Sequence, residues 1–241
     1  SIRFTHGKLL KGLTLNASGS YQDDKLTRRK QVAPQRASVA PTSMAEGISD
    51  GHYLLGEYIA DYLSEGKPVN VFVKARANGS LPFGRISNDW KLGAEYTFSK
   101  NYGRGQVYDL TRPLSAAWTS RPRAYRDIPA LQVVSTFIEE QATIPVGTNS
   151  VEVQAGARTI SLVGLDSRYN LSGKIYIDPR ANLVWNFSAL RIGNRDLRFL
   201  IAGGWGLTTK MPTIDYLFPQ VAYNDFVQLN YYDVANPLEH S

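Results

Sequence analysis

The sequence contains no cysteine, which excludes a disulfide framework and a thiolate metal site within it. Its histidines, His6, His52 and His240, stand far apart without metal-ligand spacing, so we expect no metal site and no cofactor. Long hydrophobic runs are missing too: no stretch of about 18 apolar residues predicts a transmembrane helix. Membrane-spanning strands remain open, because each needs only about 9–11 residues of alternating character.

Acidic residues are outnumbered by basic ones, which gives a net charge of +6 and a pI of about 9.4. A basic protein raises the question of nucleic-acid binding. The charges are spread along the chain, however, and the one cluster, Arg28-Arg29-Lys30, lies in a polar stretch without a nucleic-acid motif. We therefore expect a solvated surface, facing anionic lipid head groups, and no nucleic-acid partner.

Strict alternation of apolar and polar residues is the main positive signal. In Val151–Arg158, the odd positions are Val, Val, Ala and Ala, while Glu152, Gln154 and Arg158 lie between them. Side chains alternate across a strand, so this pattern predicts one apolar and one polar face. A half-buried strand of a soluble sandwich has the same pattern. Repetition with many Lys, Arg and Glu favours a water-filled barrel, because a soluble core does not absorb so many charges.

The same pattern recurs along the chain and predicts a series of strands. The predicted strands are Ile2–Thr5, Leu13–Tyr21, Val69–Ala77, Asp89–Ser99, Leu131–Ala142, Val151–Ile160, Pro179–Ser188, Leu197–Thr208 and Phe226–Tyr232. An outward set is expected to face lipid, namely Leu92, Ala94, Tyr96, Val153, Ala155, Leu183 and Trp185. Strands are expected to pair with their chain neighbours in an antiparallel meander.

The predicted connections alternate in length. Short ones cover about 6–12, 79–88, 143–150 and 189–196, and long, irregular ones cover about 22–68, 100–130, 161–178 and 209–225. Antiparallel neighbours place alternate connections at opposite ends of a sheet, so all the long ones are expected on one rim. Outer-membrane barrels have this asymmetry, with long loops outside and short turns in the periplasm.

Six short sequence segments, taken in their order along the chain, resemble segments in the barrel of TonB-dependent outer-membrane transporters (receptors) of the Bacteroidetes kind. They are Glu65–Lys74 (EGKPVNVFVK), Lys91–Tyr96 (KLGAEY), Asn101–Gly105 (NYGRG), Ala155–Arg158 (AGAR), Asp178–Ala181 (DPRA) and Lys210–Pro212 (KMP). The resemblance covers nearly the whole chain. It implies import of a nutrient such as a siderophore, vitamin, glycan or peptide. The implied partners are the TonB complex, outer-membrane lipid and, as a candidate, a surface lipoprotein, and the implied location is the bacterial outer membrane.

The predicted fold is all-β: an antiparallel up-and-down meander of about eight or nine strands that spans residues 1–241. We interpret it as one incomplete part of a large transmembrane β-barrel, an internal fragment lacking the plug domain through which TonB would act and the last barrel strands. Two alternatives stay open. One is a soluble β-sandwich or other β-rich binding module, for instance for carbohydrate, and the other is a passive porin-type channel or structural outer-membrane protein.

No enzymatic activity is expected, because no nucleophile elbow, zinc signature or phosphate loop occurs. The adjacent acids Glu139 and Glu140 point to opposite faces of a strand and cannot cooperate as acid and base. Candidate solute-binding residues lie instead in the long connections, where aromatic rings suit flat ligands and arginine suits anions. They are Trp118, Arg121, Arg123, Tyr125, Tyr216 and Phe218. The alternative is that these residues only pack the loops together.

Overall fold

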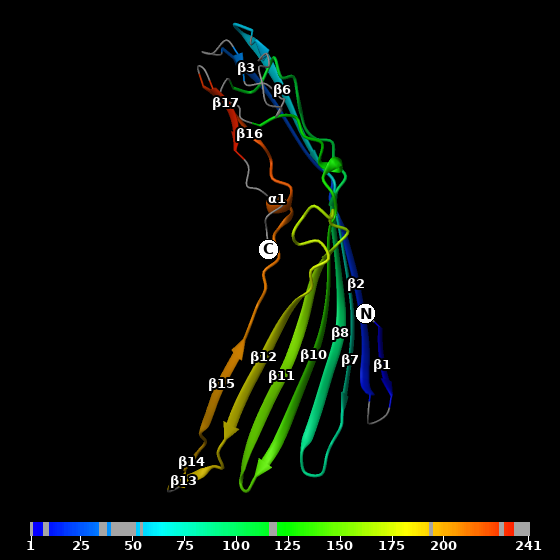
Figure 1. Cartoon of the computed structure of the whole chain (residues 1–241), viewed down its shortest axis with the longest axis vertical. Helices are drawn as coiled ribbons and strands as arrows, with labels where there is room; N and C mark the ends of the chain where they lie inside the picture. The colour runs from blue at the N-terminus through cyan, green and yellow to red at the C-terminus, as the bar shows by residue number, and fades with distance from the viewer. Residues whose placement is uncertain are drawn as a thin grey trace.

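The structure, a computed structural model, describes residues 2–6, 10–33, 38–39, 52–53, 55–115, 120–192, 195–226 and 229–233. Its regular elements are almost all antiparallel strands, which confirms the predicted all-β fold class (Figure 1). In these ranges the helices are single turns, η1 (Tyr125–Asp127) and α1 (Ile214–Leu217). The described residues contain no helix with the length and apolar character that crossing a membrane requires.

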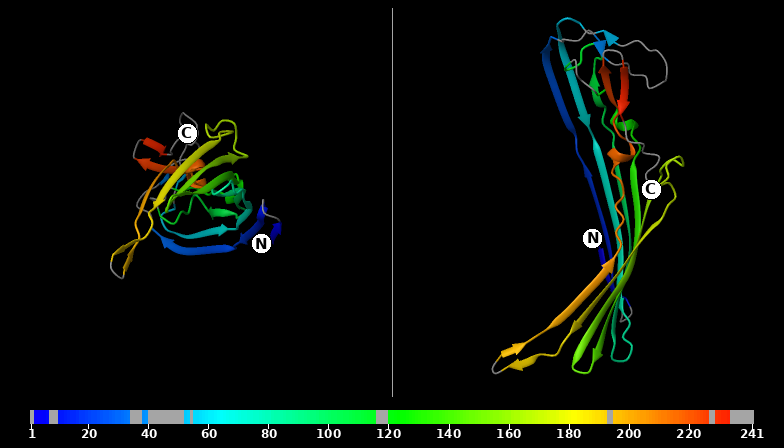
Figure 2. Two further views of the ribbon diagram at one scale, coloured as in Figure 1. Left: turned by 90° about the horizontal axis from the view of Figure 1, so that it is seen from below. Right: turned by 60° about the vertical axis from the view of Figure 1, so that its left-hand side comes forward.

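One eight-stranded sheet organises the molecule, in the order β1-β2-β7-β8-β10-β11-β12-β15. Its strands are β1 (Ile2–His6), β2 (Leu10–Tyr21), β7 (Pro68–Ser80), β8 (Ser87–Asn101), β10 (Leu131–Val146), β11 (Asn149–Val163), β12 (Tyr176–Asn186) and β15 (Leu200–Gly206). Each strand pairs antiparallel with its sequence neighbour within this sheet, as predicted. The sheet is curved and open between β1 and β15 (Figure 2).

The sheet has two chemically different faces, and β8 shows why. Ala94 lies opposite Ala75 of β7 and Thr136 of β10, whereas its neighbour Glu95 lies opposite Lys74 and Ser135. We call the side of the sheet that carries Ala75, Ala94 and Thr136 the apolar face. The side that carries Lys74, Glu95 and Ser135 is the charged face. The pairing registers also bring the whole predicted outward set, from Leu92 to Trp185, onto the apolar face.

The interpretation of residues 22–68 as a long irregular connection, in which His52–Leu63 could form a short helix or strand, is wrong for 24–32 and 58–66, because the described parts of this range are mostly strand. After β2, only Gln22 and Asp23 interrupt the chain before β3 (Asp24–Val32), and Lys67 alone separates β6 (Tyr58–Gly66) from β7. β3 pairs with β6, and β9 (Gly105–Tyr108) from the 100–130 connection adds a third strand. The hairpin of β2 and β7 therefore continues beyond the main sheet as a second sheet (Figure 1).

Smaller elements correct two further predictions. The predicted strand Phe226–Tyr232 is instead a separate two-stranded sheet of β16 (Ala222–Phe226) and β17 (Leu229–Asp233). The short connection predicted at 189–196 contains a hairpin of β13 (Leu190–Ile192) and β14 (Arg195–Leu197). The last small pair is β4 (Ser38–Val39) with β5 (His52–Tyr53).

The connections 81–86 and 147–148 lie at one end of the main sheet, which we call the short-turn end. The second sheet, η1 and the 164–175 connection follow the opposite ends of the strands, which we call the long-connection end (Figure 1). Apart from the β13–β14 hairpin, this arrangement agrees with the predicted asymmetry of the connections.

Little of the apolar side-chain surface is buried. Among residues with described side chains, two buried hydrophobic clusters occur, both at the long-connection end. One is Val32, Tyr58, Ala60, Tyr62 and Leu114, and the other is Leu162, Leu171 and Leu217. On the apolar face, by contrast, large side chains stay exposed, for example Ile138 at 60% and Ile201 at 64%. No described layer of the chain covers this face.

Candidate functional site

The charged face carries a cluster of titratable side chains from neighbouring strands around a hollow of about 600 Å³. We define the charged cluster as Lys74, Arg76, Lys91, Glu95, Glu139, Arg158, Asp178 and Arg180. These residues come from β7, β8, β10, β11 and β12, and strand alternation directs them all to the same side of the sheet. Sheet register, rather than sequence proximity, brings them together.

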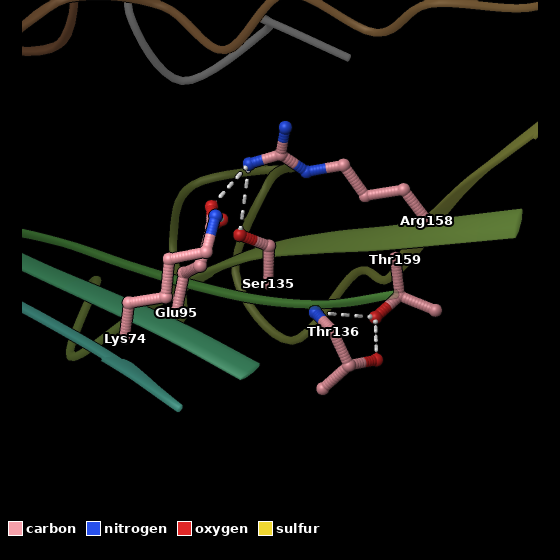
Figure 3. A network of polar contacts seen from close by, with 6 residues as sticks. All are labelled: Lys74, Glu95, Ser135, Thr136, Arg158 and Thr159. Atoms are coloured by element: carbon pink, nitrogen blue, oxygen red, sulfur yellow. Dashed lines mark hydrogen bonds and ion pairs between the residues drawn. The ribbon is translucent and has the colours of Figure 1, made fainter. Parts of the chain in front are cut away.

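Glu95 joins two cations across the sheet. Its Oε1 accepts from Lys74 Nζ at 2.6 Å and its Oε2 accepts from Arg158 Nη2 at 2.9 Å. The same Nη2 donates to Ser135 Oγ at 3.1 Å, so Arg158 of β11 reaches across β10 to β8. Figure 3 shows these side chains converging on one side of the ribbon. The Glu95 side chain is only 16% exposed, so its ion pairs with Lys74 and Arg158 are partly desolvated.

Glu139 is the centre of a second ionic group. It accepts from Lys91 Nζ at 3.0 Å and from Arg180 Nη2, and its side chain is 10% exposed. Gly156 lies in register between Glu139 and Arg180. A Cβ at Gly156 would meet the Ile138 carbonyl oxygen at 2.8 Å, so this position needs glycine. Without a side chain there, Arg180 reaches across β11 to the carboxylate.

Gly93 likewise lets the neighbouring strand β7 and the Phe137 ring lie close to its backbone. A Cβ at this position would meet the Ala75 carbonyl oxygen at 2.5 Å and the Phe137 ring at 2.7 Å. Phe137, directly opposite on β10, instead covers the glycine backbone, and Lys74 Nζ lies 5.4 Å from the centre of its ring. This distance is within the range of cation–π contacts, so the ring helps to hold the lysine beside Glu95.

Replacing Gly93 by alanine is expected to lower the free energy of unfolding by about 1–2 kcal/mol, because the added methyl group overpacks against backbone. The matched control is Gly203→Ala in β15, where an added Cβ meets nothing within 4 Å. Chemical denaturation of the folded protein measures both values. Equal stabilities of the two variants would contradict the close packing at Gly93.

The loop residues proposed from the sequence have mixed placements. Arg123 Nη2 donates to the Phe218 carbonyl at 2.7 Å, so the structure joins these two loops through backbone. Burial lowers the pKa of Arg123, partly opposed by Asp215 and Tyr125. Arg121 is 8% exposed and donates to the Ser120 carbonyl, and the Tyr125 hydroxyl lies 3.5 Å from Ser64 Oγ. These contacts join the loops to one another and to β6.

Tyr216 is 61% exposed and lines a different hollow, of about 400 Å³, with Leu171 and Met211. Trp118 lies outside the described residues. The structure thus brings Arg123 and the Phe218 backbone together, and Tyr216 lines a hollow beside Leu171, which belongs to the cluster against which Phe218 packs.

Sequence reasoning did not find the charged cluster. Its members were recognised as the polar positions of separate strands, but their mutual pairing depends on the register of five strands. Glu139 and Glu140 illustrate the limit: they point to opposite faces as predicted, yet only the register shows that Glu139 meets Lys91 while Glu140 accepts from Asn88. In the described ranges, no three His, Asp or Glu side chains are grouped to hold a metal ion.

The sequence matches no protein-family model, and comparisons with curated proteins and with solved structures give no match. The resemblance to TonB-dependent transporters therefore stays a prediction.

Proposed function

We propose that this chain forms part of the wall of an outer-membrane β-barrel, in a TonB-dependent receptor that imports a nutrient. The observation that carries this proposal is the two-faced main sheet. Its apolar face exposes large side chains on many strands, and its charged face groups eight titratable residues around a hollow. Lipid on one side and a water-filled lumen on the other would satisfy both faces at once.

The length of the strands supports the same proposal. β7, β8, β10 and β11 have 13, 15, 16 and 15 residues, more than the roughly 9–11 that a tilted strand needs to cross a bilayer. Their excess length lets the sheet extend beyond the membrane at the long-connection end. On this proposal, that end is extracellular and the second sheet is part of the external surface.

Polar groups on the apolar face also suit a lipid environment. Thr136 and Thr159 are hydrogen-bonded to each other at 2.6 Å between their hydroxyl oxygens (Figure 3). The Tyr96 hydroxyl donates to Gln132 Oε1 at 2.8 Å. Because lipid offers no hydrogen-bond partners, polar side chains that face it are expected to satisfy one another.

Separation of inner and outer membranes from cells that make the protein tests its location. We expect the protein in the outer-membrane fraction. Recovery in the soluble fraction would favour a β-sandwich or other soluble binding module. Capture of the full gene product that contains this sequence, purified in detergent, by the immobilised periplasmic domain of TonB tests the transport class, because the plug domain expected to contact TonB is not among these strands. A gene product that reaches the outer membrane and is not captured by TonB would instead be a passive channel or structural protein.

A further inference from the structure

The charged cluster has a surplus of positive charge that its internal ion pairs do not use. The hollow is lined by five basic and three acidic side chains, a net charge of +2. Glu95 and Glu139 each hold two cations, and Asp178 accepts from the backbone N–H and hydroxyl of Thr209. Arg76 has no hydrogen bond or ion pair with any described residue. The acids are therefore occupied while basic groups remain available.

The acids lie beneath the arginines. The side chains of Glu95 and Glu139 are 16% and 10% exposed, whereas those of Arg158 and Arg180 are 49% and 56% exposed. Within the described part of the chain, both arginines make these contacts through Nη2, which leaves Nε and Nη1 as further donors of side chains that line the hollow. The less exposed carboxylates thus orient the guanidinium groups without covering them.

Such an arrangement matches the requirements of an anion site. Orientation by buried partners lowers the entropy lost when a ligand is bound, and a planar guanidinium suits carboxylate and phosphate groups. A volume of about 600 Å³ is within the range of sites for small molecules. A purely structural role in holding the strands together would need neither the surplus charge nor Arg76.

We propose that the charged cluster binds a small anionic solute, which carries more than one carboxylate or phosphate group and is held by Arg76, Arg158 and Arg180. These arginines come from β7, β11 and β12, so a solute with several separated anionic groups spans them better than a single small ion. The inference rests on the proposed function, because the charged face has to border water. It narrows the imported nutrient to an anionic class.

Calorimetric titration of the purified protein in detergent micelles, with citrate and with inorganic phosphate as probes, tests this inference. We expect citrate to bind more tightly than phosphate, and both to bind more weakly as salt is added. Arg76→Gln is expected to weaken citrate binding about tenfold, the effect of losing one hydrogen bond between charged groups. Arg76→Lys keeps the charge but loses the planar guanidinium, so we expect it to bind citrate with an affinity between those of the original protein and Arg76→Gln.

Arg85 provides the matched control, because it is an exposed arginine in the 81–86 turn at the short-turn end. Arg85→Gln removes the same charge and is expected to leave citrate binding unchanged. If Arg76→Gln and Arg85→Gln weaken citrate binding equally, general charge attraction explains the binding, and the proposed site is wrong. Absence of citrate binding at millimolar concentration would overturn it as well. Since membrane location is measured separately, an outer-membrane protein that binds no anion contradicts this inference alone.

Discussion

If the proposed barrel is correct, Ala94→Arg is expected to destabilise the folded protein by about 2–4 kcal/mol, because the proposal places this arginine on the lipid-facing side near the bilayer midplane. Ala94 is at the centre of β8, exposed on the apolar face, with Ala75 and Thr136 beside it. Neither neighbour can neutralise a guanidinium group. Chemical denaturation in phospholipid vesicles gives the free energy of unfolding directly.

Two other positions sharpen this prediction. Thr97→Arg lies on the same strand but on the charged face, which the proposal places against water, so we expect a change below about 0.5 kcal/mol. Ala155→Arg shares the apolar face, but Glu140 lies directly opposite it and can partner the arginine, so a smaller loss than at Ala94 is expected. Equal losses at Ala94 and Thr97 would show that the two faces do not meet different solvents.

Glu139→Gln is expected to lower the free energy of unfolding by about 2–3 kcal/mol. The change leaves Lys91 and Arg180 without their shared carboxylate, and breaking a buried ion pair costs about 3–5 kcal/mol. The smaller value allows for the exposure of Arg180 to water, which screens part of the interaction. The same denaturation experiment measures the loss, and its size is expected to shrink at high salt.

The neighbouring acid is the control for this prediction. Glu140→Gln also removes one negative charge from β10, but Glu140 is exposed on the opposite face and accepts only from Asn88 in the described structure. We expect its stability to stay within about 0.5 kcal/mol of the original protein. If the two variants are equally stable, the ionic groups on the charged face do not hold the strands together.

Alternation predicted the main sheet well, because each of its strands has one apolar and one polar face. The pattern in Asp89–Ser99 identified β8, and the antiparallel order of the long strands followed from the regular spacing of strand and connection. β3 was missed because most of its side chains are exposed on both faces, so Arg28, Arg29 and Lys30 follow one another without an apolar position between them. Pairing with β6, rather than alternation, makes this stretch a strand.

The candidate site was harder to predict than the fold. Which loop residues meet depends on the path of the chain after β15, and Arg123 meets the Phe218 carbonyl although the two are far apart in sequence. Contacts of the charged cluster depend on register in the same way. A shift of one residue between β8 and β10 would move Glu139 away from Lys91 and onto the apolar row. Sequence patterns indicate the faces, whereas only the paired strands show which charges meet.

The central claim is that the apolar face of the main sheet lies against lipid and the charged face against water. Because the sequence has no cysteine, single cysteines introduced along β8 attach a spin label at one known position each. The most direct measurement is the accessibility of labels at residues 92, 94, 96, 97 and 99, in outer membranes, to oxygen and to a water-soluble nickel complex. We expect the labels at 92, 94 and 96, on the apolar face, to be accessible to oxygen, and the labels at 97 and 99, on the charged face, to be accessible to the nickel complex. Equal accessibility to the nickel complex at all five positions would contradict the account.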